Sequence, residues 1–335
     1  MKALALTSLL LVIVLVSLSA YLRLAHSGIG CADWPACYGE IGSGESPRDS
    51  SEPAPLRAED AYRKLVDESG RALAWATPLH RLVASVLGLL VVALFFTALR
   101  RKRQRLLSAL LLALTVYLAV LGMRSGSLHE PAVVMGNLAG GFGMLGLLGW
   151  LVFSAGSRGQ PPRRVALVTA AAGLVLCAQI LLGGLTSANF AATACRTLPD
   201  CHGGWWPGPA LAVALDLTRK HDVTAEGQAV GGAERIAIHR AHRLGAVAVL
   251  LLATLAAGMA FLANPRFRPV ALVIMLLVAT EFLVGVASVV SGLPIALAVS
   301  HNWFAGLLLL ALLKLLALST GAPDRFSTKG PSPCP

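Results

Sequence analysis

Apolar residues occur in long blocks along the chain, and short polar or basic segments separate them. A block of about 20 apolar residues is long enough to cross the hydrocarbon core of a bilayer as a helix. Helices satisfy their own backbone hydrogen bonds, which lipid cannot do. The pattern therefore predicts an all-α polytopic membrane protein with eight transmembrane helices, at residues 3–22, 79–99, 106–123, 132–153, 165–185, 241–262, 269–290 and 296–318.

Several features of the first half of the chain recur in the second half in the same order. Such internal repeats are typical of membrane folds built from two related bundles. We expect two pseudo-symmetric four-helix bundles, at residues 1–157 and 158–320, followed by a disordered cytoplasmic tail at 321–335. The matched features are the pairs Cys31/Cys37 and Cys195/Cys201, the tripeptides at 80–82 and 242–244, and the intervals from Gly122 to Pro131 and from Gly285 to Pro294.

Basic residues give the chain a net charge of +11, and many lie in alternate turns between the predicted spans. Lys and Arg concentrate on the cytoplasmic side of membrane proteins, so topology explains the charge without a nucleic-acid partner. The prediction is a multi-pass protein of the cell inner membrane, in contact with the lipid bilayer, with both termini cytoplasmic and both long loops periplasmic or extracellular. A cleaved signal peptide at the first span is the alternative, but the repeat pairs that span with the fifth.

Four cysteines lie in the two predicted outer loops, in pairs that each enclose five residues. Disulfides persist outside the cytoplasm, so each pair is expected to form a local disulfide. The remaining two cysteines, one in a span and one in the tail, are interpreted as free thiols. The expected disulfides join Cys31 to Cys37 and Cys195 to Cys201, and the free thiols are Cys177 and Cys334.

Three histidines, His80, His242 and His301, lie about one turn inside the outer ends of predicted spans. Ionisable residues inside a membrane are costly and are functional candidates, and neutral imidazole is a common axial ligand of haem iron. Taken singly, each could be a helix-end residue, and His239 could replace His242 as a ligand. Because of the repeat, we predict that His242 and His301 face each other and hold one haem iron.

Arg81 and Arg243 directly follow two of these histidines and could pair with haem propionates or act as interfacial anchors. In the first half, the position equivalent to His301 falls at or beside Asn137, which is a poor iron ligand. That half therefore has one clear candidate ligand, His80. Such asymmetry suits either one permanent cofactor and one exchanged substrate, or the decay of one site.

Glu281 is a carboxylate well inside a predicted span. An acidic residue at this depth is expected to be protonated, paired with another group or turned toward a polar cavity.

Taken together, the motifs resemble those of the haem A synthase family, which converts haem O to haem A for terminal oxidases. The resemblance covers about residues 22–316 and is most specific in the second half. The matching segments are residues 23–37, with Asp33-Trp34-Pro35, then 179–201, 238–246 and 291–302.

The resemblance implies roles for individual residues. His242 and His301 match the two haem b ligands, and His80 matches one histidine of the half that receives haem O. The family's other histidine of that half falls at Asn137 here, and Thr77 occupies the position of a glutamate that assists catalysis. Threonine is not a general base near neutral pH.

The implied activity is an oxidoreductase reaction that turns a methyl group of haem O into the formyl group of haem A. The implied partners are haem O, the haem O synthase that supplies it and an unidentified electron acceptor; a homo-oligomer stays open. The resemblance also suggests a redox role for Cys31 and Cys37, beside a structural disulfide. Because of Thr77 and Asn137, the alternative is a haem b-binding membrane protein without catalytic activity, serving electron transfer or haem handling.

Overall fold

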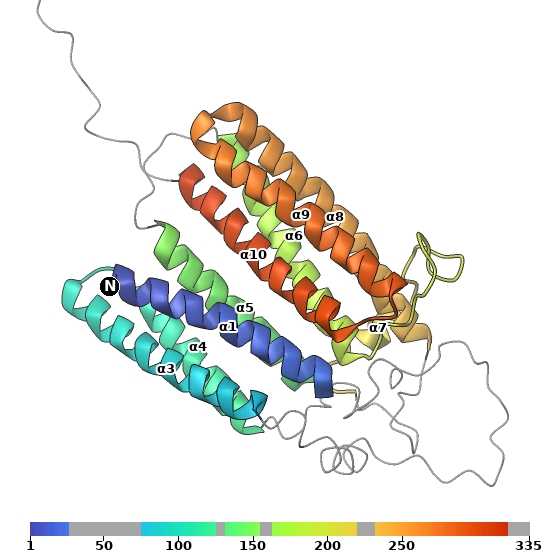
Figure 1. The fold of residues 1–335 in the computed structure, drawn as a ribbon, viewed down its shortest axis with the longest axis horizontal. Helices are drawn as coiled ribbons and strands as arrows, with labels where there is room; N and C mark the ends of the chain where they lie inside the picture. Colours follow the sequence, from blue (N-terminus) through green and yellow to red (C-terminus); the bar gives the residue numbers. More distant parts are fainter. Residues whose placement is uncertain (27–74, 125–130, 155–162, 220–231, 321–335) are drawn as a thin grey trace, which may run out of the picture.

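A computed structural model of the chain describes residues 1–26, 75–124, 131–154, 163–219 and 232–320. These residues form helices joined by short connections, and among them no β-strand is present beyond one isolated bridge between Cys201 and Gly204. The helices are α1 (Lys2–His26), α3 (Ala76–Arg101), α4 (Arg105–Arg124), α5 (Pro131–Phe153), α6 (Arg163–Ala188), α7 (Leu211–Ala214), α8 (Ala233–Ala263), η3 (Pro265–Phe267), α9 (Arg268–Val290) and α10 (Ile295–Thr320) (Figure 1).

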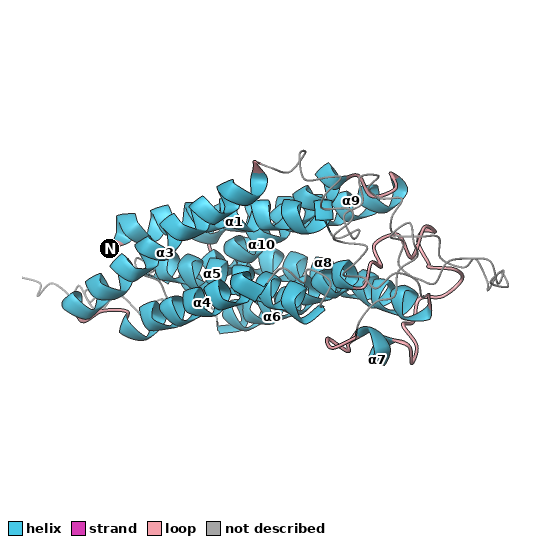
Figure 2. Ribbon diagram, turned by 90° about the horizontal axis from the view of Figure 1, so that it is seen from below, coloured by secondary structure: helices cyan, strands magenta, loops and turns pink. Residues whose placement is uncertain are grey.

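Eight of the described helices are long and apolar enough to cross a membrane, which confirms the predicted multi-pass, all-α fold. They run roughly along one direction, so that the molecule is an elongated bundle in both views (Figures 1 and 2). Exposed leucines, valines and phenylalanines cover the outside of the bundle, among them Leu89, Leu174 and Leu276. An apolar exterior of this kind is stable only against lipid.

The neighbours of each helix follow the same order in the two halves of the bundle. In the first half α1 packs on α3 and α5, and α4 packs on α3 and α5. In the second half α6 packs on α8 and α10, and α9 packs on α8 and α10. The halves meet through α5 and α10, and the crossed pairs α1–α10 and α5–α6 flank that contact (Figure 1). This repeated pattern is what a pseudo-twofold relationship requires, although the predicted boundary at 157/158 and the tail lie outside the described residues.

The contact between the halves is a packed apolar core. Leu145 and Leu148 on α5 are fully or almost fully buried. Gly306 on α10 faces α5, because a methyl group there would meet Leu145 at 3.2 Å. Leu310 on α10 faces α5 too, because a methyl group at Gly149 of α5 would meet it at 2.6 Å. Small residues at such contacts allow helices in a membrane to approach closely. The two bundles are thereby held at a fixed distance from each other.

The structure differs from the prediction most at the start of α8, which begins at Ala233 rather than at 241, whereas α10 begins at Ile295, one residue before the predicted start. His242 is therefore the tenth residue of its helix, more than two turns from its start, and His301 is the seventh residue of α10. His80, the fifth residue of α3, lies about one turn inside its helix, as predicted. The apolar pattern missed the first turns of α8 because they carry polar residues that bind an outer loop, as described below.

Candidate functional site

His242 on α8 and His301 on α10 lie next to each other inside the second bundle. Their ring centroids are 6.2 Å apart and the ring planes are inclined by 78°. Histidine nitrogens bind transition metals at about 2 Å, so rings at this separation leave room for one metal ion between them. His239, the alternative ligand one turn earlier on α8, is only 4% exposed and is not part of this ring pair.

His242 is held by two residues of the neighbouring helix α6. The side-chain amide nitrogen of Gln179 lies 3.1 Å from Nδ1 of His242 and donates to the backbone oxygen of the same residue at 2.8 Å. Gly183, one turn further along α6, faces the ring, because a methyl group there would meet Cε1 of His242 at 3.2 Å. The imidazole is therefore fixed at its Nδ1–Cε1 edge by a polar group and a close backbone.

His301 has a matching environment on α9. Its Nδ1 lies 3.3 Å from Oε1 of Glu281. A methyl group at Gly285, one turn further along α9, would meet Cε1 of His301 at 3.2 Å. Each histidine thus packs against a polar residue and a glycine four positions later, in the sequences Gln-Ile-Leu-Leu-Gly and Glu-Phe-Leu-Val-Gly. In both cases the Nδ1–Cε1 edge is turned to the supporting helix.

Several polar atoms around the two histidines are buried without a hydrogen-bond partner in the described part of the chain. They are Oε1 of Gln179, Nδ1 of His301 and Oε2 of Glu281. Buried polar groups are almost always paired, so a cluster of exceptions points to a functional site. Two neutral imidazoles are a donor set that suits haem iron, and a carboxylate beside the second ring nitrogen, as at His301, is a usual partner of a ligating histidine. Among the described residues, no set of three or more His, Cys, Asp or Glu side chains could hold a bare metal ion.

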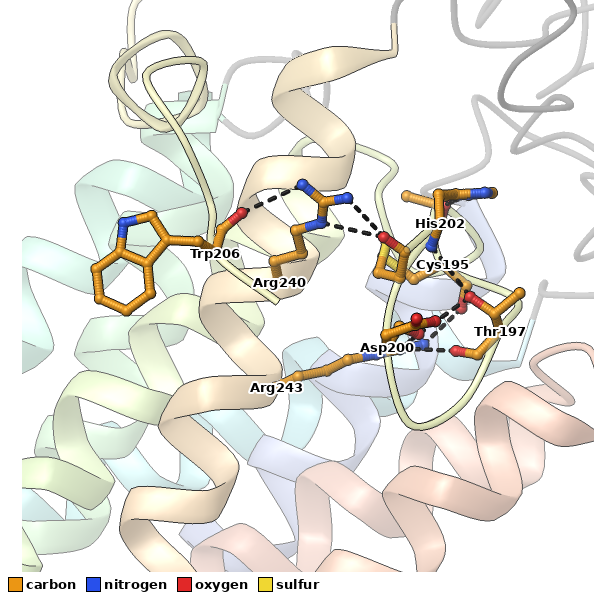
Figure 3. Close-up of a disulfide and its surroundings, with 9 residues drawn as sticks. Cys195, Thr197, Asp200, His202, Trp206, Arg240 and Arg243 are labelled. Carbon is orange, nitrogen blue, oxygen red and sulfur yellow. Dashed lines mark hydrogen bonds between the residues drawn. A yellow bond between two sulfur atoms is a disulfide. The ribbon is translucent and has the colours of Figure 1, made fainter. Parts of the chain in front are cut away.

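Arg243, next to His242, binds the loop that follows α6 and contains Cys195 and Cys201 (Figure 3). Its guanidinium donates to the backbone oxygens of Thr197, Asp200 and Cys195, each at 2.7 Å. The guanidinium therefore has three acceptors within the protein. Its expected contact with a haem propionate stays a prediction. On this geometry, Arg243 joins the helix that carries His242 to the cysteine loop.

Arg240, one turn before Arg243, binds the same loop. It donates through Nε and through one terminal nitrogen to the backbone oxygen of Cys201, at 3.2 and 2.6 Å, and to that of Trp206 at 3.2 Å (Figure 3). A methyl group at Gly204 would overlap this guanidinium, so any larger residue there would require the Arg240 side chain to shift. These polar contacts explain why α8 extends as a helix beyond its apolar stretch.

A disulfide joins Cys195 to Cys201 inside this loop, as predicted, and both cysteines are 1% exposed. The predicted partners Cys31 and Cys37 lie outside the described residues. Cys177 is a free, exposed thiol, as expected from the sequence, and Cys334 lies outside the described residues. The loop is therefore closed covalently and attached to α8 by two arginines.

The predicted residues of the first half are less closely gathered. His80 is partly buried on α3, Asn137 is partly buried on α5, and no hydrogen bond joins them within the described part of the chain. Arg81 is exposed. Thr77 lies in the first turn of α3, but its side chain is outside what the structure describes. Whether these residues form one substrate site stays a prediction.

The outer end of α3 is attached to α1. Trp75, which precedes α3, stacks on Tyr21 of α1 with ring centroids 5.7 Å apart. Arg23, half a turn further along α1, donates to Oδ1 of Asn302 at 3.3 Å, directly beside His301 on α10. Helix α1 therefore connects the region of His80 with the region of His301.

Sequence reasoning identified the two central histidines but missed their supports on α6 and α9. Gln179, Gly183 and Gly285 were not singled out as site residues, and Glu281 was noted without a partner. The usable signal is a glutamine or glutamate followed by glycine four positions later, which occurs once on α6 and once on α9, at these histidines. A helix repeats every 3.6 residues, so this spacing places both residues on the face toward one neighbour.

Comparison with known proteins shows the family to which the chain belongs. Residues 2–313 match the sequence model of the COX15-CtaA family, described as cytochrome oxidase assembly protein. The chain is 33% identical over 319 residues to a heme A synthase of Shewanella oneidensis, covering 92% of this chain and 93% of that protein. It is also 33% identical over 154 residues to a heme A synthase of Rhizorhabdus wittichii, covering 46% of this chain and 40% of that protein. The chain belongs to the COX15-CtaA family of multi-pass membrane proteins.

Proposed function

We propose that this protein is a haem A synthase-like membrane enzyme that oxidises a methyl group of haem O to the formyl group of haem A during cytochrome oxidase assembly. The observation that carries the proposal is the pair His242 and His301, 6.2 Å apart in the second bundle, each supported at its Nδ1–Cε1 edge. The similarity to heme A synthases along nearly the whole chain adds to it.

In this proposal the second bundle holds haem b permanently. His242 and His301 would bind the iron from two sides, and Gln179 and Glu281 would orient the two rings. Haem b supplies one-electron transfer when bound, because its iron changes between two oxidation states. The protein's own task is to hold the two imidazoles in place and to keep water away from the macrocycle.

The first bundle would receive haem O, with His80 as its candidate ligand. The position equivalent to Glu281 is apolar: Leu118 lies four residues before Gly122, as Glu281 does before Gly285. Since Asn137 stands where the second bundle has His301, the first bundle lacks both a second histidine and the carboxylate that would support it, which weakens its hold on iron. Weaker binding suits a substrate that must enter and leave.

The partners and the location follow from this function. Haem O would come from a haem O synthase, and the electrons would pass to an acceptor that the sequence does not identify. The protein would lie in the cell inner membrane with both termini cytoplasmic. The arginine-bound disulfide loop would then face the periplasm or the exterior, where disulfides persist.

The second candidate function is haem b binding without catalysis, in electron transfer or haem handling. Thr77 and Asn137 favour it, because the haem A synthase pattern has a carboxylate and a histidine at these positions. Leu118 also fits this reading, because it stands where the second bundle has the carboxylate of Glu281.

Pigment analysis separates the two functions. The protein is co-expressed with a source of haem O, and extracted haems are separated by chromatography. Enzyme activity predicts haem A in the wild type and its loss in His80→Ala, while haem b stays bound. Haem b without haem A under these conditions would favour the non-catalytic function. Haem b that persists in the double variant His242→Ala/His301→Ala would contradict both.

A further inference from the structure

Glu281 lies in an apolar helix where a carboxylate needs a reason to be present. Between Arg268 and Val290, α9 carries no other acidic residue, and the Glu281 side chain is 14% exposed. Placing an ionisable group within a membrane costs free energy, and such groups usually serve function.

The carboxylate is turned toward His301. Oε1 lies 3.3 Å from Nδ1 of the ring, and Gly285 brings the backbone of α9 against Cε1 of the same ring. The contact is longer than an ordinary N–H···O hydrogen bond. Nδ1 of His301 and Oε2 of Glu281 are both buried and, within the described residues, have no hydrogen-bond partner. A small movement of the carboxylate would turn the 3.3 Å contact into a hydrogen bond from Nδ1–H.

A histidine that binds a metal through Nε2 carries its proton on Nδ1, and this N–H group needs an acceptor. An ionised carboxylate only accepts hydrogen bonds, and by accepting this one it makes the ring a stronger donor to the metal. Gln179 cannot play the same part toward His242. The atom that faces Nδ1 is its amide nitrogen, which donates to the backbone oxygen of His242. An amide nitrogen does not accept hydrogen bonds. The two imidazoles are thus supported differently.

We propose that Glu281 is the positioning residue of His301: its carboxylate accepts the Nδ1–H hydrogen bond, fixes the ring so that Nε2 faces the iron, and strengthens the ring as a ligand. The inference rests on the proposed haem site between His242 and His301. It adds a residue that does not touch the iron but sets the affinity and the reduction potential of the haem through His301.

The test uses the full-length protein purified in detergent with its haem. Glu281→Leu removes the acceptor, and Glu281→Gln removes the charge but keeps an oxygen acceptor. Leu283→Ala is the matched control, because Leu283 lies two residues away on α9 and is 64% exposed. The readouts are haem content per protein, the rate of haem transfer to apomyoglobin, the midpoint potential and the low-spin electron paramagnetic resonance signal.

We expect Glu281→Leu to lose haem about tenfold faster than the wild type, as is typical when the partner of a ligating histidine is removed. Its midpoint potential should rise, because a weaker ligand stabilises ferric iron less, and its resonance signal should shift. Glu281→Gln should retain haem and show a smaller shift in the same direction. Leu283→Ala should match the wild type in all four readouts.

Two results separate failure of this inference from failure of the haem site itself. If the wild type shows a bis-histidine signal but both Glu281 variants match Leu283→Ala, Glu281 has no positioning role. The proposal also fails if Glu281→Gln and Glu281→Leu shift equally, because an acceptor oxygen retained in the glutamine variant would then have no effect on the haem. Should Glu281→Leu fail to fold, an unshifted Glu281→Gln is sufficient to overturn the proposal. If the wild type shows no bis-histidine signal, the proposed haem site is wrong instead.

Discussion

One amide group of Gln179 reaches both the ring and the backbone of His242. Its nitrogen lies 3.1 Å from Nδ1 and 2.8 Å from the carbonyl oxygen of that residue. The carbonyl lies in the middle of α8, so this bond connects α6 to the helix that carries the histidine. His242 is therefore placed by α6 as well as by its own helix.

Replacing Gln179 by leucine should loosen His242. The change removes both contacts and leaves the amide-facing edge of the ring without its polar partner, at an expected cost of about 1–3 kcal/mol. We expect lower haem content and a lower midpoint of thermal unfolding in detergent. Leu174→Ala on the same helix is the control, because Leu174 is 72% exposed. Equal unfolding midpoints for the two variants would argue against the role of Gln179.

A methyl group added at Gly183 should disturb the haem site more than one added at another glycine of α6. At Gly183 it would lie 3.2 Å from Cε1 of His242, whereas at Gly173 it would meet nothing within 4 Å. Overpacking of this kind costs about 1–3 kcal/mol. Each 1.4 kcal/mol of this cost, if it falls on the haem-bound state, lowers haem affinity about tenfold. Haem titration of the purified apoprotein measures the effect. Unchanged affinity in Gly183→Ala would show that the ring can move freely.

Arg243→Ala should release the cysteine loop from α8. The variant removes the guanidinium that donates to three backbone oxygens of the loop, and each such hydrogen bond stabilises by about 0.5–1.5 kcal/mol. We expect faster proteolytic cleavage of residues 195–206 in membrane preparations. Arg196→Ala is the control, since Arg196 is an exposed residue of the same loop. If Arg243 instead serves only a haem propionate, haem content falls while the rate of cleavage stays that of the wild type.

Removing the disulfide should destabilise the same loop. Replacing both Cys195 and Cys201 by serine opens a ring whose cysteines are six residues apart, at an expected cost of about 2 kcal/mol. Cleavage of the loop should quicken, and reductant should no longer have an effect on it. Cys177→Ser is the control, because that thiol is free. A wild-type loop that stays equally resistant with and without reductant would contradict this role.

The sequence predicted the eight spans because an apolar block of that length has few other stable structures. It also predicted that His242 and His301 would meet, which followed from the internal repeat. It placed the start of α8 eight residues late, because Arg235 and Arg240 are polar and read as part of a loop. In the structure they are helical, since their side chains bind backbone oxygens of Phe190 and of Cys201.

The supports of the histidines could not be predicted in the same way. Gln179 and Glu281 become site residues only when α6 and α9 are turned to face particular rings. That rotation depends on packing between helices, and one apolar sequence contains little information about it. Thr77, Cys31 and Cys37 remain predictions because the structure does not describe their side chains.

The most direct test of the central claim is the electron paramagnetic resonance spectrum of the purified, haem-containing protein, recorded for the wild type and for His242→Ala and His301→Ala. We predict a low-spin bis-histidine signal in the wild type and its loss in each variant, with the signal retained in His80→Ala. A bis-histidine signal that survives in either His242→Ala or His301→Ala would show that the iron is held elsewhere.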